Sequence, residues 1–541
     1  MNFKGFLAAA ALIVLSATAN AQSGPTVAVN GLGSSALFLE LGLAASSPTS
    51  SGGLGASCVW SESTSTVVAT DTTVGSLTDT GNAFVAWTPG AGGCALPDST
   101  SQIYAYLQTD SVVGNRCLFN AQLSTGAKCT IAYPTNDPAT ASTPLILASG
   151  EVSLPTAIAT ALNNAAVNVA GTDIRPEDAE FAYQRVVAPC GEAINSSQYW
   201  GLGYTNGGTI ASSISGAPFN VVSFSLPSSF TVSPVGATPI VIAANGFPAG
   251  SISSAALAKF LDGTYSYTGQ AASTPTATGN PVTVFIREPL SGTYNTMEYN
   301  VPNTTVIQTS QDAGINQPST QVNCSGTSVN ENPLNMSTPS GGARKRAIGT
   351  GQELSEALTT SDSLGYGFWS VANFKGAVSS SAVYLEVDGI DPLQSSGTAY
   401  TGTIPTTGTT ALANVTLANV ANGSYPIWSL LRLVSVGSTA PPAVSNLALA
   451  AQQFVPTGTD TSRPDFIAAP NLTVVRSHFL PPAGVGEPTA AANGHVGLST
   501  SACTTPEAGG DVGGEVFTLA ADSTFCGSRG GSLAGETGHR R

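Results

Sequence analysis

Short apolar runs that end in a polar, glycine-containing turn recur along this chain of 541 residues, and they constrain its fold more than any other feature. Residues 26–29, 103–107, 167–170 and 283–286 are four such runs. Helix-like sequence or a helix-start signal follows the first, third and fourth of them. Strands that alternate with helices indicate an α/β fold with a parallel or mixed sheet and with the turns at the strands' carboxyl ends.

Further segments fit the same class. Residues 237–244 form a continuous apolar run, which is typical of a buried strand. Ser253 is the expected N-cap of a short helix that ends near 261. The amphipathic segment 352–358 predicts a helix, and 364–369 predicts the next buried strand. The Thr-, Gly- and Ala-rich stretch 393–422 is interpreted as an edge hairpin or a return crossing.

The first 21 residues have the pattern of a cleaved secretory signal peptide. A lysine precedes an apolar run over 6–15, and Ala19-Asn20-Ala21 supplies small residues for cleavage before Gln22. No later apolar run approaches the roughly 20 residues that a membrane-spanning helix needs. We therefore expect a mature chain in the bacterial periplasm or secreted from the cell.

The eight cysteines fit an oxidising compartment, because exported thiols tend to pair. Local spacing favours disulfides between Cys117 and Cys129 and between Cys503 and Cys526, although spacing alone does not fix the connectivity. Zinc ligation is not expected, since the cysteines contain no Cys-x-x-Cys and the three histidines lie in the last part of the chain. We expect no cofactor.

The net charge of −15 argues against nucleic acid or an anionic membrane as a partner, because both need a basic face. It also limits any anion site. Since the overall field repels anions, recognition would depend on local dipoles and one or two arginines.

One such place is the run from Arg287 to Thr293, which directly follows an apolar strand. A helix start leaves backbone N–H groups unpaired, so Ser291, Gly292 and Thr293 can donate to an oxyanion while Arg287 supplies a guanidinium fork. The alternative interpretation is a strand end followed by an ordinary Ser/Thr helix cap.

Asp173 also lies at a strand end beside a helix start, where a carboxylate can simply cap the helix. Facing an anion, it would act differently from the donors around it. An ionised carboxylate only accepts hydrogen bonds, so it tolerates an oxyanion that carries a proton. It would therefore favour phosphate over fully ionised sulfate.

Other motifs are less informative. Residues 31–36 match a dinucleotide-binding glycine pattern, but no acidic residue follows between Glu40 and Glu62 to hold a ribose. The chain has no Gly-Lys dipeptide, which excludes a phosphate-loop NTPase. It also has no Gly-x-Ser-x-Gly elbow, which argues against a serine hydrolase.

Taken in order, the motifs at 31–35, 110–114, 171–173 and 287–293 resemble the phosphate-binding proteins of ABC importers. Residues 252–263, 363–367 and 424–427 are similar to later segments of that family. The resemblance implies a two-lobed α/β periplasmic-binding-protein fold with mixed sheets and a ligand cleft between the lobes. The matches are short, and long stretches without likeness separate them.

The resemblance also implies roles for individual residues. Asp173 would accept the proton of the phosphate. The ligand-binding set is Ser35, Ala36, Ser111, Asp173, Arg287, Ser291, Gly292 and Thr293. The first loop departs from the family in having Ser where Thr is usual and Ala where an aromatic residue is common. The second lacks the usual run of small residues.

The predicted organisation follows from these matches. It comprises a signal peptide (1–21), lobe 1 (22–228, with an insertion over about 46–102), lobe 2 (229–400), a return to lobe 1 (401–480) and a Gly-rich extension (481–541). The expected function is capture of inorganic phosphate, or a related protonated oxyanion, for an ABC permease in the inner membrane. We expect a monomer without enzymatic activity. The alternatives are an exported surface or adhesive scaffold and a secreted phosphatase.

Overall fold

The computed structural model describes residues 24–62, 66–71, 77–123, 129–138, 152–176, 178–179, 182, 226–248, 250–288, 290–301, 333–334, 341–347, 349–374, 379–394, 399–406, 410–453, 465–478 and 513–518. The expected signal peptide and the Cys503–Cys526 pair lie outside these ranges. Among the described residues, no helix has the length and apolar character needed to cross a membrane.

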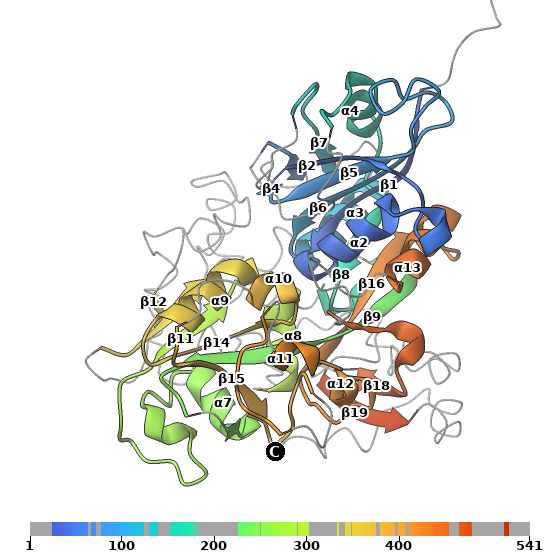
Figure 1. The fold of residues 1–541 in the computed structure, drawn as a ribbon. Helices are drawn as coiled ribbons and strands as arrows, with labels where there is room; N and C mark the ends of the chain where they lie inside the picture. The colour runs from blue at the N-terminus through green and yellow to red at the C-terminus, as the bar shows by residue number, and fades with distance from the viewer. Residues whose placement is uncertain are drawn as a thin grey trace, which may run out of the picture.

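The fold is α/β and is organised around a mixed sheet of 14 strands, whose main path runs β12-β13-β11-β14-β9-β16-β8-β1-β6-β5-β2. The two ends of this path lie in two bodies, lobe 1 and lobe 2, which Figure 1 shows one above the other. The strands of lobe 1 are β1 (Thr26–Ser34), β2 (Cys58–Glu62), β5 (Ala83–Trp87), β6 (Gln102–Thr109), β8 (Val169–Thr172) and β16 (Trp428–Val436). Those of lobe 2 are β10 (Ser251–Ile252), β11 (Thr283–Arg287), β12 (Pro333–Leu334), β13 (Ala343–Ala347), β14 (Ser363–Phe368) and β15 (Ala382–Val387).

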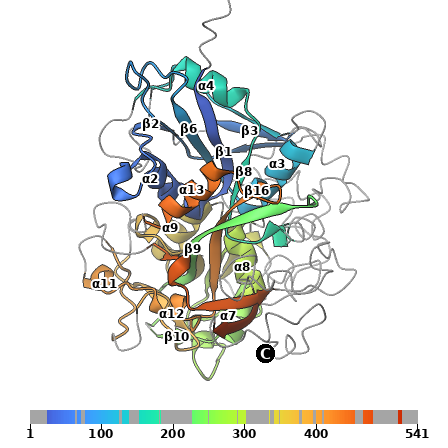
Figure 2. The ribbon, with the colours of Figure 1, turned by 90° about the vertical axis from the view of Figure 1, so that its right-hand side faces the viewer.

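Strand β9 (Phe230–Asn245) joins the two lobes. Its first part pairs with β16 over Phe230–Pro239, and its last part pairs with β14 and β15 over 240–245. The apolar run of β9 is buried from Val235 to Asn245. One strand therefore belongs to both lobes, and a view turned by 90° shows it passing from one body into the other (Figure 2).

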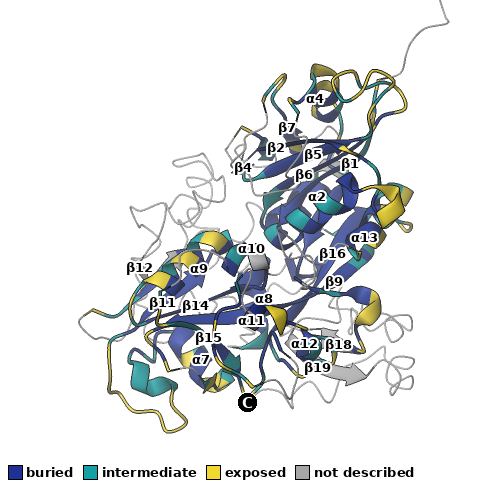
Figure 3. Ribbon diagram, in the orientation of Figure 1, coloured by how far each residue is buried: buried dark blue, intermediate teal, exposed yellow. Residues whose placement is uncertain are grey.

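Helices cover both faces of the lobe 1 sheet. On one face lie α2 (Phe38–Ser46) and α13 (Pro442–Ala451), whose apolar side chains share a core with β1, β5 and β6. On the other face lie α3 (Ser111–Leu123) and α4 (Thr156–Asn163). The strands between them are buried along most of their length, as Figure 3 shows in dark blue.

Lobe 2 has the parallel strands β11, β13 and β14 with helices α7 (Ser254–Leu261), α8 (Gly292–Asn300) and α9 (Gly349–Thr359). The predicted cap of α7 is confirmed, since the Ser253 hydroxyl accepts from the Ala256 amide at 3.1 Å. Short elements complete the structure: η1 (Ser35–Leu37), η2 (Thr49–Ser51), η6 (Thr268–Ala271), α10 (Val371–Phe374), β17 (Ile467–Ala468), η8 (Ala469–Asn471), β18 (Val474–His478) and β19 (Gly513–Thr518).

The edge hairpin considered for residues 393–422 is wrong for the described part of that stretch. It carries two one-turn helices, α11 (Thr410–Ala413) and α12 (Ala418–Ala421), and no strand. Val415, Leu417 and Val420 are buried in the core that β9 also lines. The helical turn at α12 brings these apolar side chains into the core. A hairpin would have needed alternating apolar residues and a partner strand.

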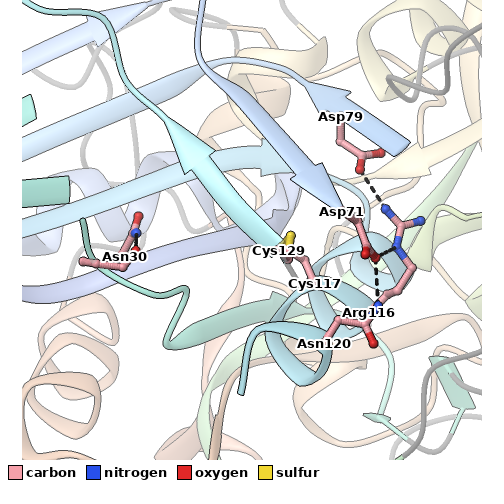
Figure 4. Close-up of a disulfide and its surroundings, with 8 residues drawn as sticks. Asn30, Asp71, Asp79, Arg116, Cys117, Asn120 and Cys129 are labelled. Carbon is pink, nitrogen blue, oxygen red and sulfur yellow. Dashed lines mark hydrogen bonds and ion pairs between the residues drawn. A yellow bond between two sulfur atoms is a disulfide. The ribbon is translucent and has the colours of Figure 1, made fainter. Parts of the chain in front are cut away.

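A second, three-stranded sheet packs beside α3. Its strands are β3 (Val68–Asp71), β4 (Leu77–Thr80) and β7 (Cys129–Ala132), in the order β4-β3-β7. The predicted disulfide between Cys117 and Cys129 is confirmed and joins α3 to β7. Beside it, Arg116 contacts Asp71 at 3.1 Å and Asp79 at 2.8 Å, as Figure 4 shows. A second disulfide links Cys58 to Cys94.

Candidate functional site

The candidate site begins at the carboxyl ends of three neighbouring strands. In the order β6-β1-β8 these strands are parallel, so Ser35, Ser111 and Asp173, which follow them, lie at one edge of the sheet. The Ser111 hydroxyl donates to Asp173 Oδ1, and the Asp173 amide donates to Ser111 Oγ at 3.2 Å. Residues separated by 62 positions are thereby in direct contact.

Gly33 permits the close approach of the strands at this edge. Its φ is +135°, and a Cβ there would collide with the carbonyl oxygen of Gly171 on β8. Only glycine tolerates both conditions. The glycines that resembled a dinucleotide motif therefore have a packing role in this structure.

Lobe 2 contributes the amino end of α8 to the same place. Ser291 caps this helix, and its hydroxyl accepts from the Tyr294 amide at 3.4 Å. A Cβ added at Gly292 would lie well inside 3.0 Å of both Asp173 Oδ1 and Ser111 Oγ. The carboxylate of lobe 1 thus lies against the first residue of a lobe 2 helix, where the helix dipole favours negative charge.

Arg287 is buried at the end of β11 and is surrounded by acids. Glu288 accepts from Arg287 Nε at 2.6 Å and from Nη2 at 2.7 Å, which makes a two-pronged ion pair. Asp110 lies 3.7 Å from Nη2 and Glu353 lies 3.6 Å from Nε. The Thr350 hydroxyl accepts from Nη1. In this conformation the guanidinium fork faces protein carboxylates.

Two of these acids are fixed by lobe 2 backbone. The Gly349 amide at the start of α9 donates to Glu288 Oε1 at 3.0 Å. The Tyr366 amide on β14 donates to Glu353 Oε1 at 3.0 Å. Both carboxylates are therefore oriented independently of the arginine, and they hold it in place.

Burial shifts the titration of the site. Burial raises the pKa of Asp173, against the opposing effects of the Ser111 hydrogen bond and of Arg287 and Arg432. Burial and the neighbouring Glu288 carboxylate raise the pKa of Asp110 well above its ordinary value. For Arg287, burial lowers the pKa, but Glu288, Glu353 and Asp110 outweigh it and the net shift is upward.

Acidic side chains outnumber basic ones among the described residues of the site. Four carboxyl groups gather here, those of Asp110, Asp173, Glu288 and Glu353, around the guanidinium of Arg287. Arg432 on β16, whose register partner is Thr172 beside Asp173, is also buried. An anion that enters this site must therefore bring protons or displace a carboxylate from its donors.

A cavity of about 170 Å³ lies between the lobes beside Arg287. Lobe 1 lines it with Ser35, with the segment 80–82 and with 108–110 and Val113, and lobe 2 lines it with Arg287, Glu288 and Gly349. Ser35 and Arg287 are thus the two predicted ligand residues that reach this cavity. Ser291 and Thr293 are buried at the start of α8, and the Ala36 amide donates to Ser34 Oγ at 3.2 Å.

Sequence reasoning did not assign Glu288, Glu353, Asp110 or the segment 80–82 to the site. Glu288 directly follows Arg287, but successive side chains along a strand point to opposite faces, so their adjacency did not predict the ion pair. Glu353 comes from α9, more than 60 residues away, and 80–82 comes from the stretch predicted to be an insertion. Among the described residues, no group of three or more His, Cys, Asp or Glu side chains is placed to hold a metal ion.

No family model matches the chain, and no curated protein matches it. Solved structures match it in part. A phosphate-binding protein from Stenotrophomonas maltophilia is 15% identical, with 69% of this chain and 87% of that one covered and a TM-score of 0.30. An ABC-type phosphate transport receptor from Vibrio cholerae is 11% identical, with 42% of this chain and 68% of that one covered and a TM-score of 0.26.

A third match is a protein from Clostridium perfringens, solved with bound phosphate and described as a phosphate ABC transporter substrate-binding protein. It is 14% identical, 41% of this chain is covered, and the TM-score is 0.25. The chain spans 65% of the length of that protein. Similarity at this level does not extend to the ligand.

Proposed function

We propose that this chain is an extracytoplasmic solute-binding protein that captures inorganic phosphate, or a related protonated oxyanion, between its lobes for an ABC permease in the inner membrane. The main observation behind this proposal is that Asp173 and Ser111 of lobe 1 lie against Gly292 of lobe 2. A binding protein of this class needs both lobes to contact one ligand, and these residues come from both.

The helix start supplies the attraction for an anion. The amino end of α8 has a partial positive charge, and Gly292 lets a ligand approach its backbone closely because it has no side chain. In this structure the Asp173 carboxylate takes that place. An oxyanion would take it when the lobes separate, and closure would then seat the ligand between Asp173 and the helix.

The acids of the site supply the selectivity. A ligand between Asp173 and α8 has to offer a proton to the carboxylate and lone pairs to the helix amides. Phosphate that retains a proton meets both demands at neutral pH. Sulfate carries no proton there, so it would face Asp173 without a hydrogen bond and in a poorly solvated place.

Isothermal titration of the purified full chain with phosphate and with sulfate tests the proposal. We expect phosphate to bind with a Kd in the micromolar range or below and sulfate to bind at least about 100-fold more weakly, a difference of roughly 2.7 kcal/mol. The variant Asp173→Asn should admit sulfate, because the amide can donate to an unprotonated oxygen. Arg287→Ala should weaken the binding of both anions.

The control is Glu356→Gln, which removes one negative charge from α9 without touching the site. Glu356 is partly exposed on the same helix as Glu353. It should leave both affinities within about twofold of the original. Failure of the unaltered protein to bind any oxyanion would overturn the proposal and favour a surface scaffold.

A further inference from the structure

Two buried carboxyl groups meet across the boundary between the lobes. Asp110 follows β6 of lobe 1 and Glu288 follows β11 of lobe 2, and both line the cavity between the lobes. The Asp110 carboxyl is hydrogen-bonded to the Glu288 carboxyl. The two residues are only 6% and 1% exposed, so this contact is shielded from solvent.

A hydrogen bond between two carboxyl groups requires a proton, because an ionised carboxylate only accepts. Glu288 already accepts from Arg287 Nε at 2.6 Å, from Arg287 Nη2 at 2.7 Å and from the Gly349 amide at 3.0 Å. No N–H or O–H group of the described residues donates to Asp110 Oδ2, which is buried. The shared proton therefore lies on Asp110, which donates it to Glu288.

The charges around this pair increase the need for the proton. Arg287 Nη2 lies 3.7 Å from Asp110 Oδ1, but Glu288 occupies the guanidinium fork with both oxygens. Glu353 on α9 lies 3.6 Å from the same guanidinium. Burial raises the pKa of Asp110 well above its ordinary value, and Glu288 and Asp173 act in the same direction, against Arg287. An ionised Asp110 would thus add a further negative charge to a buried, acid-rich place.

This contact exists only while the lobes are together. When they separate, Asp110 moves with lobe 1 and Glu288 with lobe 2, and water then solvates both carboxyl groups. The pKa of Asp110 then returns toward its ordinary value. Between these two pKa values the closed form binds one proton more than the open form. Closure is therefore favoured at lower pH and is progressively lost as the pH rises through this window.

We propose that Asp110 and Glu288 form a proton-dependent latch, in which closing the lobes takes up one proton that the two carboxyl groups share. Loss of that proton favours the open form. The latch concerns closure itself, so it goes beyond the proposed function and does not require phosphate as the ligand.

Small-angle X-ray scattering of the full chain tests the latch, with the open-to-closed ratio followed from about pH 5 to about pH 9 in buffers without phosphate or sulfate. We expect this ratio to rise with pH by up to about tenfold per pH unit, the limit for one proton. Asp110→Asn replaces the acid with an amide of similar size that donates to Glu288 at every pH. In this variant the ratio should change by less than about twofold across the range.

Glu288→Gln is a second variant, since its amide can donate to an ionised Asp110. It should also remove the pH response, and it gives a reading where Asp110→Asn does not fold. Two comparisons isolate the latch. Asp173→Asn alters the other acid at the boundary, and Glu356→Gln removes one negative charge from α9. Both should retain the response of the unaltered protein.

Two outcomes overturn the latch. One is an open-to-closed ratio that does not depend on pH in the unaltered protein. The other is a response that survives in Asp110→Asn and disappears in Asp173→Asn, which would assign the proton to Asp173. Because the scattering is recorded without an oxyanion, neither outcome bears on phosphate capture, and failure to bind phosphate in the titrations would leave the latch standing.

Discussion

Asp173 of lobe 1 lies so close to Gly292 of lobe 2 that no side chain larger than hydrogen fits between the carboxylate and the start of α8. The contact joins the carboxyl end of β8 to the amino end of a helix in the other lobe. It also places a negative charge where the helix dipole favours an anion. The glycine therefore fixes both the contact between the lobes and the chemistry of the site.

Gly292→Ala tests this relationship. The added Cβ would collide with Asp173 Oδ1 and Ser111 Oγ, so one lobe must shift. We expect the free energy of unfolding to fall by about 1–3 kcal/mol, as for other overpacked sites. Phosphate affinity should fall at least about tenfold. Chemical denaturation and titration calorimetry measure the two effects.

A matched glycine is available on α9. A Cβ at Gly351 meets no heavy atom within 4 Å, and the residue is exposed in a helix. Gly351→Ala should therefore stabilise the protein by about 0.5–1 kcal/mol, because alanine loses less backbone freedom on folding. Equal effects of the two substitutions on stability and affinity would contradict the special role of Gly292.

The ion pair of Arg287 and Glu288 leads to a second prediction. Glu288 competes with any anion for the guanidinium fork, which it binds with both oxygens. Glu288→Gln removes that competing charge, while Glu353 still holds the arginine from the α9 side. We expect phosphate to bind about tenfold more tightly, a gain of roughly 1.4 kcal/mol, by titration calorimetry at low salt.

The same removal of charge at Glu356 serves as the comparison. Glu356→Gln should change phosphate affinity by less than about twofold, because its carboxylate has no part in the ion-pair network at Arg287. Weaker phosphate binding in Glu288→Gln would mean that Glu288 mainly orients the arginine toward the ligand.

The parts of the fold that depend on local signals were predictable from the sequence. Apolar runs predicted the central strands, and Ser253 predicted a helix start. Both features depend on residues that are close together in the sequence. The gathering of Ser35, Ser111 and Asp173 followed from one rule, that parallel strands end at a common edge.

The partners of Arg287 could not be predicted in the same way. Glu353 and Thr350 reach it from α9, and Asp110 reaches it from the other lobe. These contacts depend on how whole elements pack. The role of the apparent insertion 46–102 could not be predicted either. No local sequence pattern indicates that residues 80–82 line the cavity beside Asp110.

The disulfides allow a test of the lobe 1 scaffold. Cys117–Cys129 closes a loop with a sequence separation of 12, and Cys58–Cys94 closes one of 36. Chain-entropy reasoning gives stabilisations of roughly 3 and 4 kcal/mol respectively. We expect the double variant Cys117→Ser with Cys129→Ser to lose roughly that first amount in denaturation under oxidising conditions. No loss relative to the unaltered protein would indicate that the pair is reduced.

The last prediction concerns Asp79, which lies beside the same disulfide and contacts Arg116 at 2.8 Å. Burial, with a smaller effect of Asp71, raises the pKa of Asp79 from 3.8 to about 6, although Arg116 opposes the shift. Between these values the folded protein binds more protons at this site than the unfolded chain does. The free energy of unfolding should therefore fall as the pH rises through this window, by about 3 kcal/mol in total from this group.

Asp79→Asn removes this contribution because an amide does not titrate. Its stability relative to the unaltered protein should increase by about 2.4 kcal/mol between pH 4 and pH 7, measured by denaturation at each pH. For Asp98→Asn we expect the opposite trend, with stability relative to the unaltered protein falling as the pH rises. Hydrogen bonds from Thr100 and the Ala91 backbone lower the pKa of Asp98. The stability that its carboxylate contributes is present above the ordinary pKa and is lost as the pH falls. Parallel profiles for Asp79→Asn and the unaltered protein would show that Asp79 is ionised throughout and that Arg116 outweighs the effect of burial.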